Sequence, residues 1–242
     1  MKLLAIDCAT EHCSAALWLH GALIERSAPP ARGLSEHLLQ WVAELLDEAG
    51  LGLRQLDLLA FGRGPGAFTG VRLAASLAQG LALSTGLPVV PVSTLRAVAA
   101  HALALAPRAA GVLVCQDARM NEVYWGRFMR RGDDTVALDS ERLDPPEAVV
   151  MPDPVEVRAG GDAPGAIIAA GSGFSVYPPL AQAWQARDGI TPAAPPLQCP
   201  PRARDIAHLA AGDGLSAAVS AAQALPTYLR NNVASPATHQ AL

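Results

Sequence analysis

The chain has 242 residues and a mass of 25.0 kDa, enough for one large domain or for two domains of about 100 residues each, and we expect two. Hydrophobic residues make up 51% of the sequence, aromatic residues only 5%, and the formal net charge is −4. Lys2 is the only lysine and the arginines are scattered, which argues against an extensive nucleic-acid-binding face.

The sequence carries no export or membrane signal. The N-terminus reaches Asp7 after four apolar positions, short of the roughly 7 to 15 that a signal segment needs, and later apolar runs end before the roughly 18 of a membrane span. We therefore expect a soluble cytoplasmic protein. The sequence has no C-x-x-C, H-x-x-x-H or H-E-x-x-H spacing, so we expect reduced, buried thiols at the cysteines and no metal site. The cysteines are Cys8, Cys13, Cys115 and Cys199.

The first half of the chain predicts alternating strands and helices. Strands are expected at 3–6, 13–19, 23–26, 56–61 and 87–92, and helices at 35–49, 71–83 and 94–104. A tight turn at His20 and Gly21 joins the second and third strands. Ser35 is expected to cap the first helix and Gly50 to end it.

The second half begins after residues 106–110 and repeats the start of the chain. An apolar strand again ends in an aspartate, Asp117 in place of Asp7, and a polar turn and a second strand follow. Prolines interrupt the remainder, where we expect a strand at 166–170 and helices at 179–186 and 205–211. The repeat predicts a duplicated α/β fold of the actin-like/Hsp70-like kind. We expect a complete N-terminal domain at 1–104 that carries the partner-binding helices, a reduced C-terminal domain at 105–230 and a mobile tail at 231–242.

A glycine-rich loop connects the strand at 56–61 to the helix that follows. It contains Gly62, Gly64, Pro65, Gly66 and Gly70. It is not a Walker loop, because Gly70 is followed by valine, and it lacks the third glycine of a dinucleotide fingerprint. We interpret it as a rigid turn that lets the next helix pack closely against a neighbour, either within the domain or in a partner.

Asp7 and Thr10 are candidates for a residual nucleotide cleft. An aspartate at this point holds magnesium in actin-like ATPases, but the hairpin that follows has no glycine, and Glu11 adds negative charge. A small-molecule kinase or ATPase that uses Asp7 for Mg-nucleotide stays as an alternative function. Arg119, between Asp117 and Glu122, predicts a salt-bridged turn, with general acid/base catalysis as the alternative.

Several ordered motifs together resemble the bacterial TsaB (YeaZ) family over the whole chain. They are Ile6-Asp7, Ser35-Glu-His-Leu-Leu, Gly62-Arg-Gly-Pro-Gly-Ala-Phe-Thr-Gly-Val-Arg72, Pro88-Val-Val-Pro-Val-Ser-Thr-Leu95, Asp117-Ala-Arg-Met-x-Glu122-Val-Tyr-Trp125, Gly171-Ser-Gly and Pro226-Thr-Tyr-Leu-Arg230. The resemblance implies an actin-like fold and a part in forming N6-threonylcarbamoyladenosine next to the anticodon of tRNAs that read codons beginning with A.

The resemblance also implies a non-catalytic subunit with no cofactor beyond weak nucleotide binding at a subunit interface. Its implied partners are the catalytic TsaD, the TsaE ATPase and a TsaC-type supplier of threonylcarbamoyl-adenylate, and tRNA is reached through the complex. Catalytic relatives carry a metal-binding H-x-x-x-H where this chain has Thr94 and Val98, and the second half has only Gly160-Gly161 as a glycine pair. These departures put older peptidase labels for the family in doubt.

Family members use the two N-terminal helices to form a homodimer or the complex with TsaD. By resemblance, we expect the following residues at the partner interface: Leu38, Trp41, Val42, Leu45, Arg72, Leu73, Ser76, Leu77 and Gly80.

Overall fold

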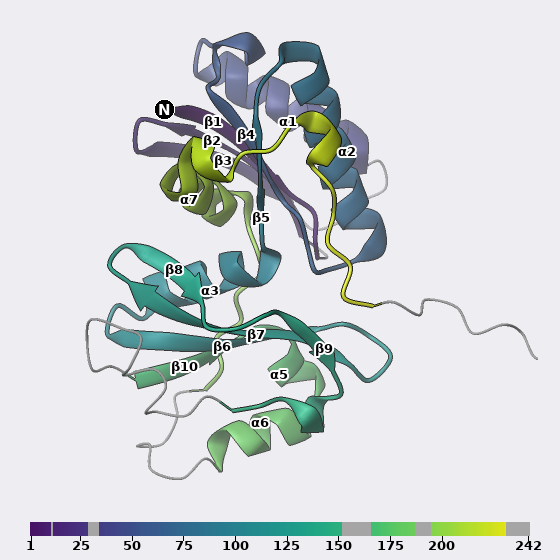
Figure 1. Ribbon diagram of the computed structural model, residues 1–242, viewed down its shortest axis with the longest axis vertical. Helices are drawn as coiled ribbons and strands as arrows, with labels where there is room; N and C mark the ends of the chain where they lie inside the picture. The colour runs from purple at the N-terminus through teal and green to yellow at the C-terminus, as the bar shows by residue number, and fades with distance from the viewer. Residues whose placement is uncertain (11, 29–33, 152–165, 187–194, 231–242) are drawn as a thin grey trace, which may run out of the picture.

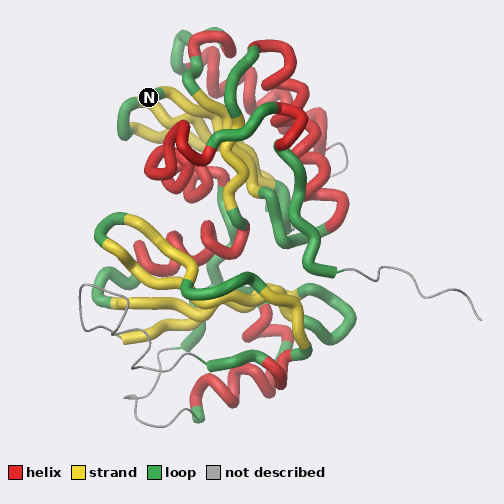
Figure 2. The backbone as a smooth tube through the Cα atoms, viewed as in Figure 1, coloured by secondary structure: helices red, strands yellow, loops and turns green. Residues whose placement is uncertain are grey.

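The computed structural model describes residues 1–10, 12–28, 34–151, 166–186 and 195–230 (Figure 1). Glu11, the pair Gly160-Gly161 and the expected tail at 231–242 lie outside these residues. The described chain forms two five-stranded sheets, each with helices on both faces (Figure 2), which confirms the predicted α/β class. No helix in the described ranges combines the length and apolar character that crossing a membrane requires.

The first sheet has the strand order β3-β2-β1-β4-β5. Its strands are β1 (Lys2–Asp7), β2 (Cys13–Leu19), β3 (Ala22–Ala28), β4 (Leu58–Gly62) and β5 (Val89–Val92). β1 runs antiparallel to β2 and parallel to β4, so the carboxyl ends of β1, β4 and β5 meet at one edge. The tight turn between β2 and β3 is confirmed, because His20 and Gly21 both have positive φ.

Helices α1 (Leu34–Glu48) and α2 (Phe68–Thr85) cover one face of the first sheet, and α7 (Ala203–Asp213) covers the other. Small side chains such as Ala74 and Ala78 bring α2 close to the sheet. α1 begins at Leu34, one residue before the expected start. α2 begins at Phe68, earlier than the expected residue 71.

The second sheet has the order β10-β6-β7-β8, with β9 also paired to β7. Its strands are β6 (Ala109–Asp117), β7 (Val123–Arg131), β8 (Asp134–Ala137), β9 (Arg142–Asp144) and β10 (Ala166–Ala170). Helix α3 (Thr94–Leu105) covers one face, and α5 (Gly173–Val176) and α6 (Pro178–Gln185) cover the other. Short 3-10 helices occupy Leu53–Gln55, Pro146–Ala148, Gly214–Ala217 and Ala221–Gln223.

The two sheets share a pattern of pairing. β6 is antiparallel to β7 and parallel to β10, as β1 is to β2 and β4, and each central strand ends in an aspartate, Asp7 or Asp117. We call each sheet with its helices a lobe; α3 and α7 pack against each other between the lobes. Residues 203–230, counted with the second domain in the sequence prediction, pack largely on the first lobe, where α7 contacts β1 and β2.

Candidate functional site

The glycine loop lies directly on the turn that follows β1. A side chain at Gly62 would collide with the Asp7 carboxylate, one at Gly66 with the Ala9 carbonyl, and one at Gly70 with the Cys8 carbonyl. Since two of these obstacles are backbone atoms, only glycine permits so close an approach. The loop and the β1–β2 turn therefore form one packed unit.

Backbone hydrogen bonds join this loop to several distant segments. The Ala67 amide donates to the Ala9 carbonyl at 2.7 Å, and the Arg63 amide donates to the Val92 carbonyl at 2.8 Å. Gly64, which has a φ of +95° and a cis peptide bond to Pro65, accepts from the Thr94 amide at 3.0 Å. These bonds fix the loop against both β5 and the start of α3.

Asp7 is fully buried behind Gly62. One carboxylate oxygen, Oδ2, accepts from the Ala9 amide at 3.4 Å, and Oδ1 has no hydrogen-bond partner among the described residues. Burial raises the pKa of Asp7 to about 7. The hydroxyl of Thr94, also fully buried and without a described partner, lies near the same point: a Cβ built at Gly62 would come within 3.5 Å of it.

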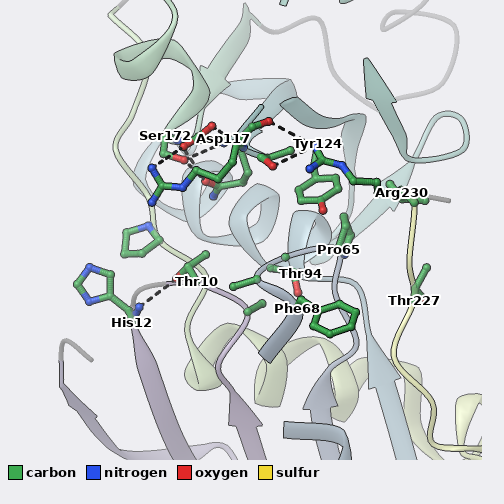
Figure 3. A pocket seen from close by; sticks show the side chains of 18 of the residues that line it. Thr10, His12, Pro65, Phe68, Thr94, Asp117, Tyr124, Ser172, Thr227 and Arg230 are labelled. Carbon is green, nitrogen blue, oxygen red and sulfur yellow. Dashed lines mark hydrogen bonds and ion pairs between the residues drawn. The ribbon is translucent and has the colours of Figure 1, made fainter. Parts of the chain in front are cut away.

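A cavity of about 1060 Å³ separates the two lobes (Figure 3). One side of its lining comes from the β1–β2 turn, the glycine loop, α2 and the start of α3. The other comes from the end of β6, β7 and the segment around Ser172, and residues 198–200 and 227–230 complete it. The main lining side chains are Thr10, His12, Pro65, Phe68, Arg72, Thr94, Asp117, Arg119, Tyr124, Ser172, Thr227, Tyr228 and Arg230. The lining includes Thr10, one residue of the expected nucleotide cleft. Asp7, the other, is not among the described lining residues.

The turn after β6 has three successive residues in the left-handed region. Arg119, Met120 and Asn121 have φ values of +62°, +56° and +58°, which are costly for residues other than glycine. Arg230 holds this turn, because its guanidinium donates to the Arg119 carbonyl at 3.3 Å and pairs with Glu122. Arg119 itself pairs with Asp117 at 3.2 Å. The expected salt-bridged turn is present, with Arg230 as an additional member.

The expected partner-interface residues of α1 divide into two groups. Leu38, Val42 and Leu45 are buried in the core between α1 and the first sheet, so the prediction that they face a partner is wrong. The apolar stripe of an amphipathic helix that covers a sheet faces the protein core. Trp41 is partly buried, and Leu39, which was not predicted, is 51% exposed.

The expected residues of α2 lie on its outer side. Arg72, Ser76 and Gly80 are exposed, and Leu73 and Leu77 are partly buried. A Cβ built at Gly80 meets no atom within 4 Å. We call Trp41 of α1, together with these five residues of α2, the outer helix face.

One cluster at the mouth of the cavity was missed by sequence reasoning. The Arg72 guanidinium stacks on Phe68, with Cζ 3.3 Å from the ring centroid, and its Nε donates to the Tyr228 hydroxyl at 2.8 Å. The four-residue spacing of Phe68 and Arg72 on one helix could have indicated the stack. No sequence spacing links Tyr228 to this stack, because it lies 156 residues after Arg72 in the chain.

The two positions that the family resemblance aligns with metal-binding histidines of catalytic relatives lie one turn apart on α3. Thr94 is at the first turn, and Val98 is buried against the second sheet. Neither side chain is a metal ligand of the histidine type. Within the described ranges, no three His, Cys, Asp or Glu side chains gather closely enough to hold a metal ion. All four cysteines are free and buried, as predicted.

Comparison with known proteins identifies the class to which this fold and site belong. The family described as TsaD: tRNA N6-adenosine threonylcarbamoyltransferase matches residues 29–238. The tRNA threonylcarbamoyladenosine biosynthesis protein TsaB of Escherichia coli is 38% identical over 238 residues, which cover 97% of this chain and 96% of that protein. The Haemophilus influenzae protein of the same name is 47% identical over 130 residues, 54% of this chain and 55% of its own length.

A solved structure agrees with these sequence relatives. YeaZ from Pseudomonas aeruginosa superimposes with a TM-score of 0.79 at 38% identity, over 94% of this chain and 99% of that one. The chain belongs to the TsaB (YeaZ) family. A second Pseudomonas aeruginosa structure, with a TM-score of 0.79 and 38% identity over 95% of this chain and 99% of that one, is described as similar to peptidase YeaZ.

Proposed function

We propose that this chain is the non-catalytic, activating subunit of the complex that forms N6-threonylcarbamoyladenosine next to the anticodon of tRNAs reading codons that begin with A. It binds the catalytic TsaD-type subunit in the cytoplasm and works with the TsaE-type ATPase, while a TsaC-type protein supplies the threonylcarbamoyl-adenylate. Relatives named for this biosynthesis support the pathway. The scattered arginines support contact with tRNA through the complex rather than by this chain alone.

The residues at positions 94 and 98 carry the non-catalytic part of the proposal. A catalytic relative needs two histidines, one turn apart, as metal ligands. Here Val98 lies in the core with no exposed surface, and Thr94 offers only a hydroxyl. Valine has no donor atom and threonine has no imidazole nitrogen, so the two positions cannot supply a pair of histidine-type ligands. The same reasoning argues against peptidase chemistry at this place.

The outer helix face is the proposed docking surface for the catalytic subunit. Its small residues, Ser76 and Gly80, allow a second helix to approach closely, and the partly buried Leu73 and Leu77 supply apolar area. Leu83, at the end of α2, is 77% exposed and extends the apolar surface. We propose that the isolated chain uses this face to form a homodimer and exchanges that contact for the catalytic subunit.

A matched pair of variants tests this surface. Gly80→Arg places a long charged side chain on the outer helix face, into open space, and the fold should be kept. Gly212→Arg does the same on the exposed side of α7, where a Cβ also meets no atom within 4 Å. In a pull-down with the TsaD-type subunit, we expect Gly80→Arg to weaken binding at least about tenfold and Gly212→Arg to leave it unchanged. Equal binding by both variants would remove the outer helix face from the proposal.

A kinase or ATPase that uses Asp7 is less well supported. The Asp7 carboxylate is buried behind Gly62, outside the described lining of the cavity, so magnesium bound in the cavity has no direct contact with it. Steady ATP turnover by the isolated chain, abolished by Asp7→Ala, would favour this alternative.

The shared pairing pattern of the two sheets supports duplication of one α/β unit. We propose that the first lobe retains the complete unit and that the second is reduced. The expected boundary near residue 105 falls after α3 (Thr94–Leu105), but α3 packs on the second sheet and so belongs to the second lobe.

A further inference from the structure

The C-terminal segment connects the two lobes along one side of the cavity. We call residues 224–230, which follow the short 3-10 helix at Ala221–Gln223, the strap. Figure 1 shows it in yellow, passing beside α2 toward the second lobe. The strap contains most of the Pro226-Thr-Tyr-Leu-Arg230 motif's contacts, and its last four residues all line the cavity: Thr227, Tyr228, Leu229 and Arg230. The strap therefore forms part of the cavity wall.

The first lobe holds the strap through buried and paired groups. Ala224 is fully buried in the core beside α2. The Thr227 amide donates to the Arg63 carbonyl at 2.7 Å, and Nη1 of Arg63 donates to the Thr227 hydroxyl at 2.6 Å. A Cβ at Gly64 would lie 3.0 Å from the Thr227 carbonyl, so the strap lies directly on the glycine loop. Burial and a satisfied backbone amide make this the more stable anchor.

The second lobe holds the strap by Arg230. Its guanidinium donates to the Ala118 and Arg119 carbonyls at 3.1 Å and 3.3 Å and pairs with Glu122. All three partners belong to the turn after β6. Since Thr227 and Arg230 are three residues apart, the chain between the two anchors reaches at most about 11 Å when fully extended. The cavity therefore cannot widen on this side unless one anchor releases.

Other contacts join the lobes away from the cavity. Arg96 of α3 bonds Asp213 of α7 at 2.7 Å and Asp134 of β8 at 2.8 Å, and the Ser93 hydroxyl donates to Glu141. None of these five residues is among the described residues that line the cavity. These contacts fix the lobes to each other at the α3 side, and the strap joins them along the cavity.

The Arg230 anchor contains groups that oppose its own docking. Residues 119–121 all have left-handed backbone, which is unfavourable for residues other than glycine. The Nε of Arg230 is buried and has no hydrogen-bond partner in the described part of the chain, and a buried donor without a partner is costly. Both costs disappear when Arg230 and the turn enter solvent. They offset part of the favourable guanidinium bonds, so this anchor is the weaker of the two.

We propose that the strap controls the opening of the cavity and that it releases at Arg230. In the docked state, Arg230 keeps residues 119–121 left-handed and the strap closes one side of the cavity. On release, the turn relaxes, the strap stays on the first lobe through Thr227, and the cavity widens on that side. This device needs neither the catalytic subunit nor the outer helix face, so it stands apart from the role proposed above.

Two native thiols can report this opening. Cys199 lines the cavity, whereas Cys115 is fully buried in the second-lobe core and is not among the described lining residues. Alkylation of the full chain with iodoacetamide, followed by peptide mass spectrometry, gives a rate for each thiol. Arg230→Gln should raise the rate at Cys199 at least about tenfold and leave the rate at Cys115 unchanged. Arg131→Gln, at an exposed position at the end of β7, is the matched control and should behave as the natural chain does.

Two more variants test the Arg230 anchor from both sides. Glu122→Gln removes the carboxylate partner, should also speed alkylation of Cys199, and should add little to Arg230→Gln, because both changes remove one interaction. Arg230→Lys keeps the charge and should lie between the natural chain and Arg230→Gln. Hydrogen exchange at residues 118–122 should accelerate together with the alkylation, while the Thr227 amide should keep its protection.

Three results would overturn the proposal. Faster hydrogen exchange at residues 118–122 with an unchanged rate at Cys199 would show that Arg230 holds the turn but does not close the cavity. Equal acceleration at Cys199 and Cys115 would show general loosening of the second lobe. An unchanged rate at Cys199 in every variant would show that the strap does not control access. None of these results depends on capture of the TsaD-type subunit.

Discussion

Replacing Asp7 with asparagine should change how the stability of this protein depends on pH. In the folded chain the carboxyl group is fully buried, Oδ1 has no described partner, and burial raises its pKa from 3.8 to about 7. The unfolded chain releases the same proton near the ordinary pKa of an aspartate. Asparagine is nearly the same size and does not titrate.

The direction of the effect follows from proton binding. Between about pH 4 and pH 7, folded Asp7 holds a proton that the unfolded chain has lost, so the free energy of unfolding falls as the pH rises. The interval from 3.8 to about 7, at about 1.4 kcal/mol for each pH unit, amounts to about 4 kcal/mol. The loss is complete above about pH 7, where both states are ionised.

Urea denaturation at about pH 4.5 and about pH 8 measures this difference. The natural chain should lose about 3 to 4 kcal/mol more than Asp7→Asn between the two pH values. Asp47→Asn, at an exposed position on α1, is the matched control and should follow the natural chain. Parallel curves for the natural chain and Asp7→Asn would refute a neutral, buried carboxyl group behind Gly62.

Two further predictions concern backbone geometry. Gly70→Ala should destabilise the fold by about 2 to 3 kcal/mol, because its methyl group collides with the Cys8 carbonyl, whereas Gly80→Ala on the exposed side of α2 should stabilise it by about 0.5 to 1 kcal/mol. Equal denaturation midpoints for these variants would contradict the close contact of the glycine loop with β1. Arg230→Lys should cost about 2 kcal/mol and speed proteolysis at residues 119–121, since an ammonium group cannot replace the guanidinium bonds that hold this turn. An unchanged rate of proteolysis would show that the turn at residues 119–121 stays ordered without the Arg230 hydrogen bonds.

Much of the first lobe could be predicted because its strands are apolar runs that end at polar or turn residues. In the first lobe β2 matches its expected range, and the turn at His20 and Gly21 was found from its residues. In the second lobe β10 also matches its expected range. β8 and β9 are short and polar and were missed. The position of α7 on the first sheet could not be read from the sequence, because an alanine-rich helix after a proline-rich segment has no signal for which sheet it covers.

The candidate sites were harder to predict, since one sequence signal serves two purposes. The apolar stripe of Leu38, Val42 and Leu45 suits a core as well as a partner surface, and the structure places it in the core. Arg72 was selected as an interface residue, but its stacking on Phe68 and its bond to Tyr228 depend on a segment distant in sequence. The residue types at Thr94 and Val98 can be read directly, whereas their correspondence to the histidines of catalytic relatives rests on the family resemblance.

Reconstituted tRNA modification tests the central proposal most directly. The assay measures N6-threonylcarbamoyladenosine in tRNA with the TsaD-type, TsaE-type and TsaC-type proteins, ATP and threonine, with and without this chain. We expect no product from the chain alone or from the mixture without it, restored synthesis when it is added, and little product with Gly80→Arg. Product from the chain without the TsaD-type protein, or equal synthesis whether or not the chain is present, would contradict the proposed role.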